Sequence, residues 1–139
     1  MDFGLNGKAA IVTGGSVGIG KAIARELALE GVDVAIAARR QDLLEQAASE
    51  LSRETGRKVV PIVADTTSRE SVENLVKSAT DIMGRGADIL VNNAALPGGL
   101  VLGPLAESDE ADLMADIDTK VVGYFRCAKA VAPHMQSQG

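Results

Sequence analysis

Residues 13–20 have the sequence Thr-Gly-Gly-Ser-Val-Gly-Ile-Gly, and they separate a short apolar run from a segment with helical periodicity, residues 18–29. Three of the glycines, Gly14, Gly18 and Gly20, permit positive φ angles and let the backbone approach a bound group closely. The N-terminus of the following helix offers free N–H groups and the positive end of a dipole, which together favour phosphate. The sequence therefore predicts a strand, a turn able to hold phosphate, and a helix.

Apolar runs of strand length alternate with helical patterns along the rest of the chain. Strands are expected at residues 9–12, 32–38, 59–64 and 88–91, helices at 18–29, 42–54, 68–83 and 108–136, and a Gly/Pro-rich loop at 96–104. Such alternation predicts a parallel sheet covered on both faces. Pro61 suits an edge strand, so the strand order 3-2-1-4 is expected. The predicted fold is a Rossmann-like, doubly wound α/β domain spanning residues 1–139 and incomplete on its C-terminal side.

Helical periodicity predicts an inward face of Ile19, Ile23 and Leu27 in the first helix, and Ser68 is a suitable N-cap for the third. In the last helix the same periodicity predicts an apolar stripe of Leu113, Ile117, Val121, Phe125, Ala128, Ala132 and Met135.

Composition and charge argue against several classes of protein. The chain of 139 residues has 2% aromatic residues and a net charge of −5, so binding to nucleic acid is not expected. The single cysteine, Cys127, excludes an internal disulfide, and the single histidine, His134, leaves no zinc cluster. No signal peptide is evident, and no apolar run approaches the roughly 20 residues of a membrane span. We expect a cytoplasmic protein without a metal site.

The glycine-rich turn is open to three interpretations. A tight turn without a ligand would need fewer glycines than this one contains. A P-loop would carry Ser or Thr after Lys21 to hold magnesium, but Ala22 stands there. The third interpretation is a dinucleotide site, although the spacing is Gly14-x-x-x-Gly18-x-Gly20 rather than the common G-x-G-x-x-G. We prefer the third.

This spacing resembles the TGxxxGxG loop of the short-chain dehydrogenase/reductase family. Asp65 follows the third strand as in that family, Asn92-Asn93-Ala94-Ala95 is similar to its NNAG motif, and residues 124–135 resemble its long fifth helix. The resemblance extends over the whole chain. It implies an oxidoreductase that transfers hydride between a nicotinamide dinucleotide and a small carbonyl or alcohol substrate. It also implies a homo-oligomer assembled partly through the long helix.

The resemblance also implies which residues bind the cofactor. In the glycine loop, Gly14, Gly18 and Gly20 make room for the pyrophosphate, Ser16 lies near the adenosine ribose, and Ile19 lies beneath the nicotinamide ring.

After the third and fourth strands, the resemblance places Asp65 and Thr66 at the adenine edge and Asn92 and Ala94 along the ribose side. Two of these residues have alternative explanations. Asp65 is also explained as a carboxylate near a helix N-terminus, where the dipole favours it. Asn92 is also explained as a structural amide that joins neighbouring strands.

The end of the second strand bears on cofactor preference. An acid there would bond to the ribose 2′-OH and repel a 2′-phosphate, but Arg39 and Arg40 follow Ala38 instead. Two guanidinium groups can grip a phosphate, so NADP is expected over NAD. The alternative is a solvated basic pair at the start of the second helix.

The catalytic residues of the family are not found in this chain. The family's catalytic Ser and its Tyr-x-x-x-Lys pair are absent. The one tyrosine, Tyr124, does not form such a pair, because Ala128 stands four residues later in place of Lys. Lys120 stands where the family carries an Asn that supports a proton relay. We expect the NADP-binding half of a dehydrogenase/reductase, as a fragment or truncated product that self-associates through the open edge of its fourth strand. The alternative is a non-catalytic dinucleotide-binding or regulatory module.

Overall fold

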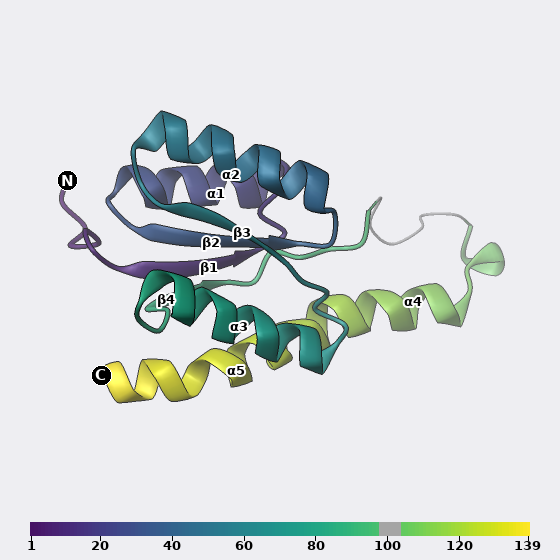
Figure 1. Cartoon of the computed structure of the whole chain (residues 1–139). Coiled ribbons are helices and arrows are strands. Elements are labelled where there is room, and N and C mark those ends of the chain that lie inside the picture. The colour runs from purple at the N-terminus through teal and green to yellow at the C-terminus, as the bar shows by residue number, and fades with distance from the viewer. Residues whose placement is uncertain (98–103) are drawn as a thin grey trace.

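The computed structural model describes residues 1–97 and 104–139. Four parallel strands form one sheet in the order β3-β2-β1-β4, with helices on both faces (Figure 1). The strands are β1 (Ala9–Thr13), β2 (Asp33–Ala38), β3 (Val59–Val63) and β4 (Ile89–Val91). The helices are α1 (Gly18–Leu29), α2 (Gln41–Thr55), α3 (Arg69–Met83), α4 (Glu110–Ile117) and α5 (Gly123–Gln138), with a 3-10 turn (Leu105–Glu107) and a π-turn (Asp118–Val122).

This architecture confirms the predicted Rossmann-like α/β fold and the strand order. The strand that contains Pro61 is outermost, as expected from its missing N–H. The first seven elements begin and end within one residue of the predicted positions. Of the expected loop at 96–104, residues 98–103 lie outside the described part of the chain.

The sheet separates two apolar cores. Ala10 and Val12 of β1 belong to the core with residues of α1 and α2, whereas Ile11 belongs to the core with residues of α3 and α5. The first pair of helices covers one face of the sheet and the second pair the other (Figure 1). Successive side chains of a strand point to opposite faces, so continuously apolar strands fill both cores. The two cores hold the carboxyl ends of the strands, and the loops that follow them, in a fixed arrangement.

Local signals define the ends of α2 and α3. Each helix is followed by a glycine in the left-handed region, Gly56 (φ 68°) and Gly84 (φ 72°), which is the usual residue at this position. Ser68 caps α3 by accepting a hydrogen bond from the Ser71 N–H at 3.2 Å. The Ser68 cap was predicted and is confirmed.

The inward face of α1 differs from the prediction by one position. The buried residues are Gly20, Ala24 and Ala28, each one residue after the predicted Ile19, Ile23 and Leu27. Because glycine and alanine are small, the helix packs closely on the sheet, and its larger side chains lie beside the contact. Ile19 is 74% exposed.

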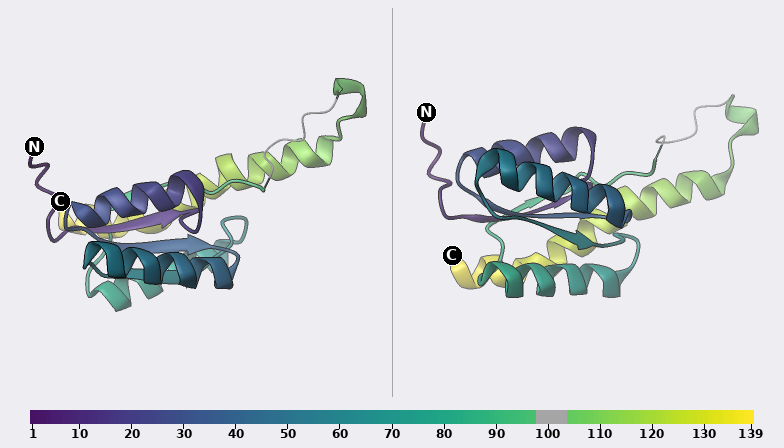
Figure 2. Two further views of the ribbon diagram at one scale, coloured as in Figure 1. Left: turned by 90° about the horizontal axis from the view of Figure 1, so that it is seen from above. Right: turned by 45° about the horizontal axis from the view of Figure 1, so that its top comes forward.

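The predicted long helix over 108–136 is present: α4, the π-turn and α5 follow one another without a break from Glu110 to Gln138. Its predicted apolar stripe is wrong, because most of these residues are exposed, including Leu113, Val121 and Phe125. The physical reason is position: α4 extends beyond the edge of the layered domain and has no buried residue (Figure 2). The buried face of the π-turn and α5 consists instead of Thr119, Gly123, Cys127 and Val131.

None of the helices described is both long and apolar enough to cross a membrane.

Candidate functional site

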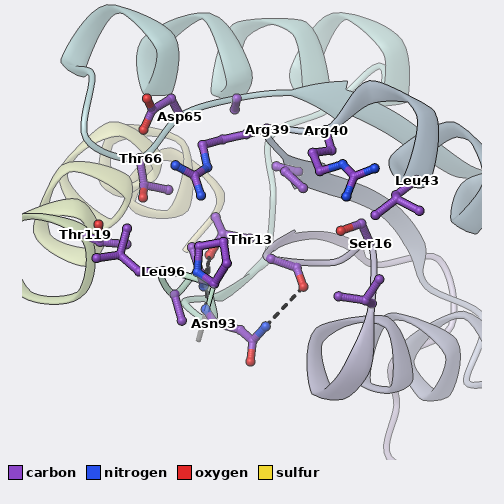
Figure 3. A pocket seen from close by; sticks show the side chains of 18 of the residues that line it. Thr13, Ser16, Arg39, Arg40, Leu43, Asp65, Thr66, Asn93, Leu96 and Thr119 are labelled. Atoms are coloured by element: carbon purple, nitrogen blue, oxygen red, sulfur yellow. Dashed lines mark hydrogen bonds between the residues drawn. The ribbon is translucent and has the colours of Figure 1, made fainter. Parts of the chain in front are cut away.

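A cavity of about 480 Å³ lies at the carboxyl ends of the strands (Figure 3). It is lined by the glycine loop, the end of β2, the β3–α3 loop, the segment after β4, and Thr119 of the π-turn. Parallel α/β sheets bind ligands at this edge, and the volume is within the range of small-molecule sites. The predicted site residues that line the cavity are Gly14, Ser16, Ile19, Arg39, Arg40, Asp65, Thr66 and Ala94.

Gly18 and Gly20 do not line the cavity, and the structure gives them a supporting role. Gly18 has φ 57°, in the left-handed region that side chains rarely adopt. A Cβ atom on Gly20 would collide with the carbonyl of Gly14. The two glycines therefore allow α1 to begin directly behind the loop, so that its N-terminus faces the cavity.

Thr13, which sequence reasoning missed, ties β4 to the glycine loop. Its buried Oγ1 accepts hydrogen bonds from the N–H groups of Asn93 (3.1 Å) and Ala94 (3.2 Å). The same hydroxyl donates to the carbonyl of Val91 at 3.3 Å. The Asn93 side chain completes the link by donating from Nδ2 to the Gly14 carbonyl at 3.2 Å. The hydroxyl at the last residue of β1 was the available signal for this network.

Asn92 also lies outside the cavity lining, and it connects β4 to α5 rather than to a neighbouring strand. Its Nδ2 donates to the Tyr124 carbonyl at 3.5 Å. The Tyr124 hydroxyl in turn donates to the carbonyl of Ala94 at 2.8 Å. The structural role considered for Asn92 is thus carried by Thr13 and Asn93, while Asn92 and Tyr124 hold α5 against the segment after β4.

Asp65 is held in place by its own loop. Its Oδ1 accepts from the Thr67 N–H (2.9 Å) and hydroxyl (2.7 Å), and its own N–H donates to Ser71 Oγ at 2.9 Å. The Thr67 hydroxyl bond is the main reason that the pKa of Asp65 lies below its ordinary value, against an opposing effect of burial. Arg39 and Arg126 lower this pKa further. A fixed carboxylate therefore faces the cavity.

Two arginines approach the cavity from the end of β2. Arg39 lies beside Asp65 and Thr66, whereas Arg40 is directed towards the side of Ser16 (Figure 3). Arg40 also forms an exposed ion pair with Asp42 at 3.1 Å. The cavity thus has positive charge at one end and the glycine loop beside it.

Three other residues noted in the sequence, Cys127, His134 and Lys120, do not line the cavity. Cys127 is buried, and burial raises the pKa of its thiol to about 11, which disfavours the reactive thiolate. The His134 side chain packs against Gly86, so closely that a Cβ atom on Gly86 would lie 2.6 Å from the Cβ of His134. This part of α5 does not line the cavity. Lys120 forms an ion pair with Asp116, one helical turn earlier, with 3.2 Å between Lys120 Nζ and Asp116 Oδ1.

Comparison with known proteins bears on the same stretches. A model of short chain dehydrogenases matches residues 8–139, nearly all of the chain. This chain belongs to the short chain dehydrogenase family. Within that family it is 40% identical over 135 residues to glycine betaine reductase of Emericella nidulans. The match covers 97% of this chain and 10% of that protein. It is also 39% identical over 136 residues to an uncharacterized oxidoreductase of Staphylococcus aureus, and that match covers 96% of this chain and 55% of the relative.

Solved structures of short chain dehydrogenases have the same fold. L-sorbose reductase from Gluconobacter frateurii, complexed with NADPH and L-sorbose, is 35% identical with a TM-score of 0.91, and the match covers 100% of this chain and 51% of that one. NAD⁺-bound xylitol dehydrogenase is 34% identical with a TM-score of 0.87, and the match covers 96% of this chain and 50% of that one. The chain thus spans about half the length of these two enzymes.

Proposed function

We propose that residues 1–139 form the dinucleotide-binding domain of an NADP-preferring dehydrogenase/reductase that interconverts a small carbonyl compound and an alcohol. The observation that carries the preference is Arg39, which lines the cavity at the end of β2 where an NAD site would hold an acid. Relatives solved with NADPH and with NAD⁺ both resemble this chain, so the preference rests on its own residues.

The proposed cofactor pose follows the chemistry of the lining. The pyrophosphate would lie against Gly14 and the N-terminus of α1, which offers N–H donors and a favourable dipole. The adenine would lie beside Asp65 and Thr66. The exposed side chain of Ile19 would support the nicotinamide ring, which supplies or accepts the hydride.

Arg39 is the better of the two candidates for the 2′-phosphate. The guanidinium of Arg40 is already paired with Asp42. Arg39 lies at the adenine side and lowers the pKa of Asp65, so its charge acts where the ribose of the adenosine would be placed. A guanidinium can grip phosphate through two parallel hydrogen bonds.

Titration calorimetry with Arg39→Ala tests this preference. A charge-assisted hydrogen bond contributes about 1.5–3 kcal/mol, so the Kd for NADPH should rise roughly 10- to 150-fold while that for NADH changes little. Arg53→Ala, which removes an exposed arginine from the far end of α2, is the matched control. An equal loss of affinity for NADPH and NADH would contradict the assignment.

The hydride-transfer part of the proposal concerns the whole protein that contains this chain. It predicts carbonyl-dependent oxidation of NADPH by that protein, measured with a panel of small ketones and aldehydes. NADPH binding without turnover of any such substrate would favour a regulatory module instead.

A homo-oligomer is also part of the proposal. Apolar side chains on α4, the π-turn and α5 are half or more exposed, among them Met114, Val121 and Phe125. A second copy would cover them. Analytical ultracentrifugation of the whole protein tests this, and Phe125→Glu should shift the sedimentation towards the monomer.

A further inference from the structure

Arg126 of α5 reaches across to the β3–α3 loop. Its Nη1 donates to the Thr66 carbonyl at 3.1 Å and to the Asp118 carboxylate at 2.9 Å. The residue does not line the cavity, but Thr66 does, and Thr66 is buried. Arg126 therefore contacts the back of a segment whose front faces the cavity.

The π-turn explains how one side chain serves both partners. An α-helix rotates about 100° per residue, so side chains eight positions apart point about 80° away from each other. A π-turn accommodates one extra residue in a helix, so that the side chains after it are shifted by one position relative to those before it. The π-turn at Asp118–Val122 thus brings Asp118 and Arg126 towards the same face, where the Asp118 carboxylate orients the guanidinium.

Close packing keeps α5 and this loop in register. Gly123 is buried against Thr66, and a Cβ atom added there would lie 3.1 Å from Thr66 Oγ1 and 3.2 Å from its carbonyl oxygen. Other hydrogen bonds hold the loop through its own Thr67, through Ser71 of α3 and, at Ala64, through the Ala38 carbonyl at the end of β2. In the part of the chain that the structure describes, Arg126 supplies the only side-chain hydrogen bond from α5 to this loop.

We propose that Arg126 is a positioning residue for the adenine side of the cofactor site. This inference rests on the proposed function and extends it to a residue outside the cavity. Arg126 fixes the Thr66 peptide, and the Thr66 peptide fixes the direction of the neighbouring Asp65 carboxylate. Removal of the guanidinium frees the Thr66 carbonyl and lets the adenine edge of the site move while the glycine loop stays in place.

Half-cofactors separate this role from a general structural one. Adenosine 2′,5′-bisphosphate probes the adenine end, and reduced nicotinamide mononucleotide probes the other end. With Arg126→Met, we expect the Kd for adenosine 2′,5′-bisphosphate to rise about tenfold, the range of one lost charge-assisted bond. The Kd for reduced nicotinamide mononucleotide should remain within about twofold, since the glycine loop does not contact Arg126.

Two further variants sharpen the test. Arg126→Lys retains the charge beside Asp118 but loses the planar fork, so its Kd for adenosine 2′,5′-bisphosphate should lie between those of the wild type and Arg126→Met. Lys129→Ala removes the same charge from an exposed site one turn along α5 and should leave both values unchanged.

Amide hydrogen exchange provides a readout that needs no nucleotide. In the ligand-free protein, Arg126→Met should speed exchange at Thr67 and Ser68 more than at residues of β1, and Lys129→Ala should not. A parallel loss of affinity for both half-cofactors, or unchanged exchange at Thr67, would overturn the positioning role. Failure of the wild type to bind any of these nucleotides would refute the proposed function, while the exchange data would still decide whether Arg126 orders the loop.

Discussion

Helices α3 and α4 have similar local sequence signals but different surroundings. α3 lies beneath the sheet beside α5 and buries four residues, Val72, Leu75, Val76 and Ala79. α4 has its own apolar residues, yet it extends past the sheet and buries none (Figure 2). An apolar period therefore shows which face of a helix is available for packing, whereas topology decides whether a partner is present.

The N-terminal caps of the two helices make this comparison stronger. Ser68 caps α3, and Asp109 caps α4 by accepting from the Ala111 N–H at 3.0 Å. α4 also has acidic residues in its first turn, which suit the helix dipole. Helical stability in proteins comes mainly from tertiary packing. The two helices should thus respond very differently to the same kind of substitution.

The largest effect is expected in the core beneath α3. Leu75 is 1% exposed, and Leu75→Ala should lower the free energy of unfolding by about 2–5 kcal/mol, as large-to-small core changes do. Urea denaturation followed by circular dichroism measures this. A loss below about 1 kcal/mol would show that α3 is packed no more firmly than α4.

Removal of the caps should give a smaller difference. Ser68→Ala should destabilise the protein by about 1 kcal/mol, because unravelling of α3 at this end disturbs the core. Asp109→Ala should change global stability by less than about 0.5 kcal/mol, because α4 can fray without exposing buried residues. Equal losses in denaturant titrations of the two variants would break the comparison.

The pH dependence of stability should report on the loop that precedes α3. The pKa of Asp65 is lowered in the folded protein, so its contribution is present above the ordinary pKa of the carboxyl group. That contribution is lost as the pH falls through the lowered value. Asp65→Asn should therefore flatten the loss of stability in acid, measured by thermal unfolding at a series of pH values. Asp112→Asn, at an exposed position in α4, serves as the control and should leave the profile nearly unchanged.

The smallest effect is expected on α4 itself. Leu113 is 50% exposed, and Leu113→Ala should alter the free energy of unfolding by no more than about 0.5 kcal/mol. A loss of more than about 2 kcal/mol would mean that α4 packs on a partner in solution, most simply a second copy of the chain.

Strand order and most element boundaries were predictable because they depend on local patterns. Pro61 alone places β3 at an edge, and the glycines after α2 and α3 mark their ends. The inward face of α1 was missed because periodicity gives weight to large apolar residues, whereas the buried face consists of Gly20 and the alanines that follow it one and two turns later.

The candidate site was predictable where its residues belong to a motif. Gly14 and Arg39 follow strands directly, and Asp65 follows β3 after one residue, so parallel topology alone brings them to one edge. The supporting contacts were not predictable in this way. The pairing of Thr13 with the segment after β4 spans about eighty residues, and the contact of Arg126 with Thr66 depends on a π-turn that no local signal marks.

The burial of Cys127 makes the protein a convenient host for site-specific probes. This thiol is the only one in the sequence, and its pKa of about 11 keeps it protonated, so maleimide dyes at neutral pH should leave the folded chain unmodified. A second cysteine introduced at an exposed position, such as Leu113→Cys on α4, would then be the single attachment point for a fluorophore or spin label. The mobility of such a label would report directly on whether α4 is free or covered in solution.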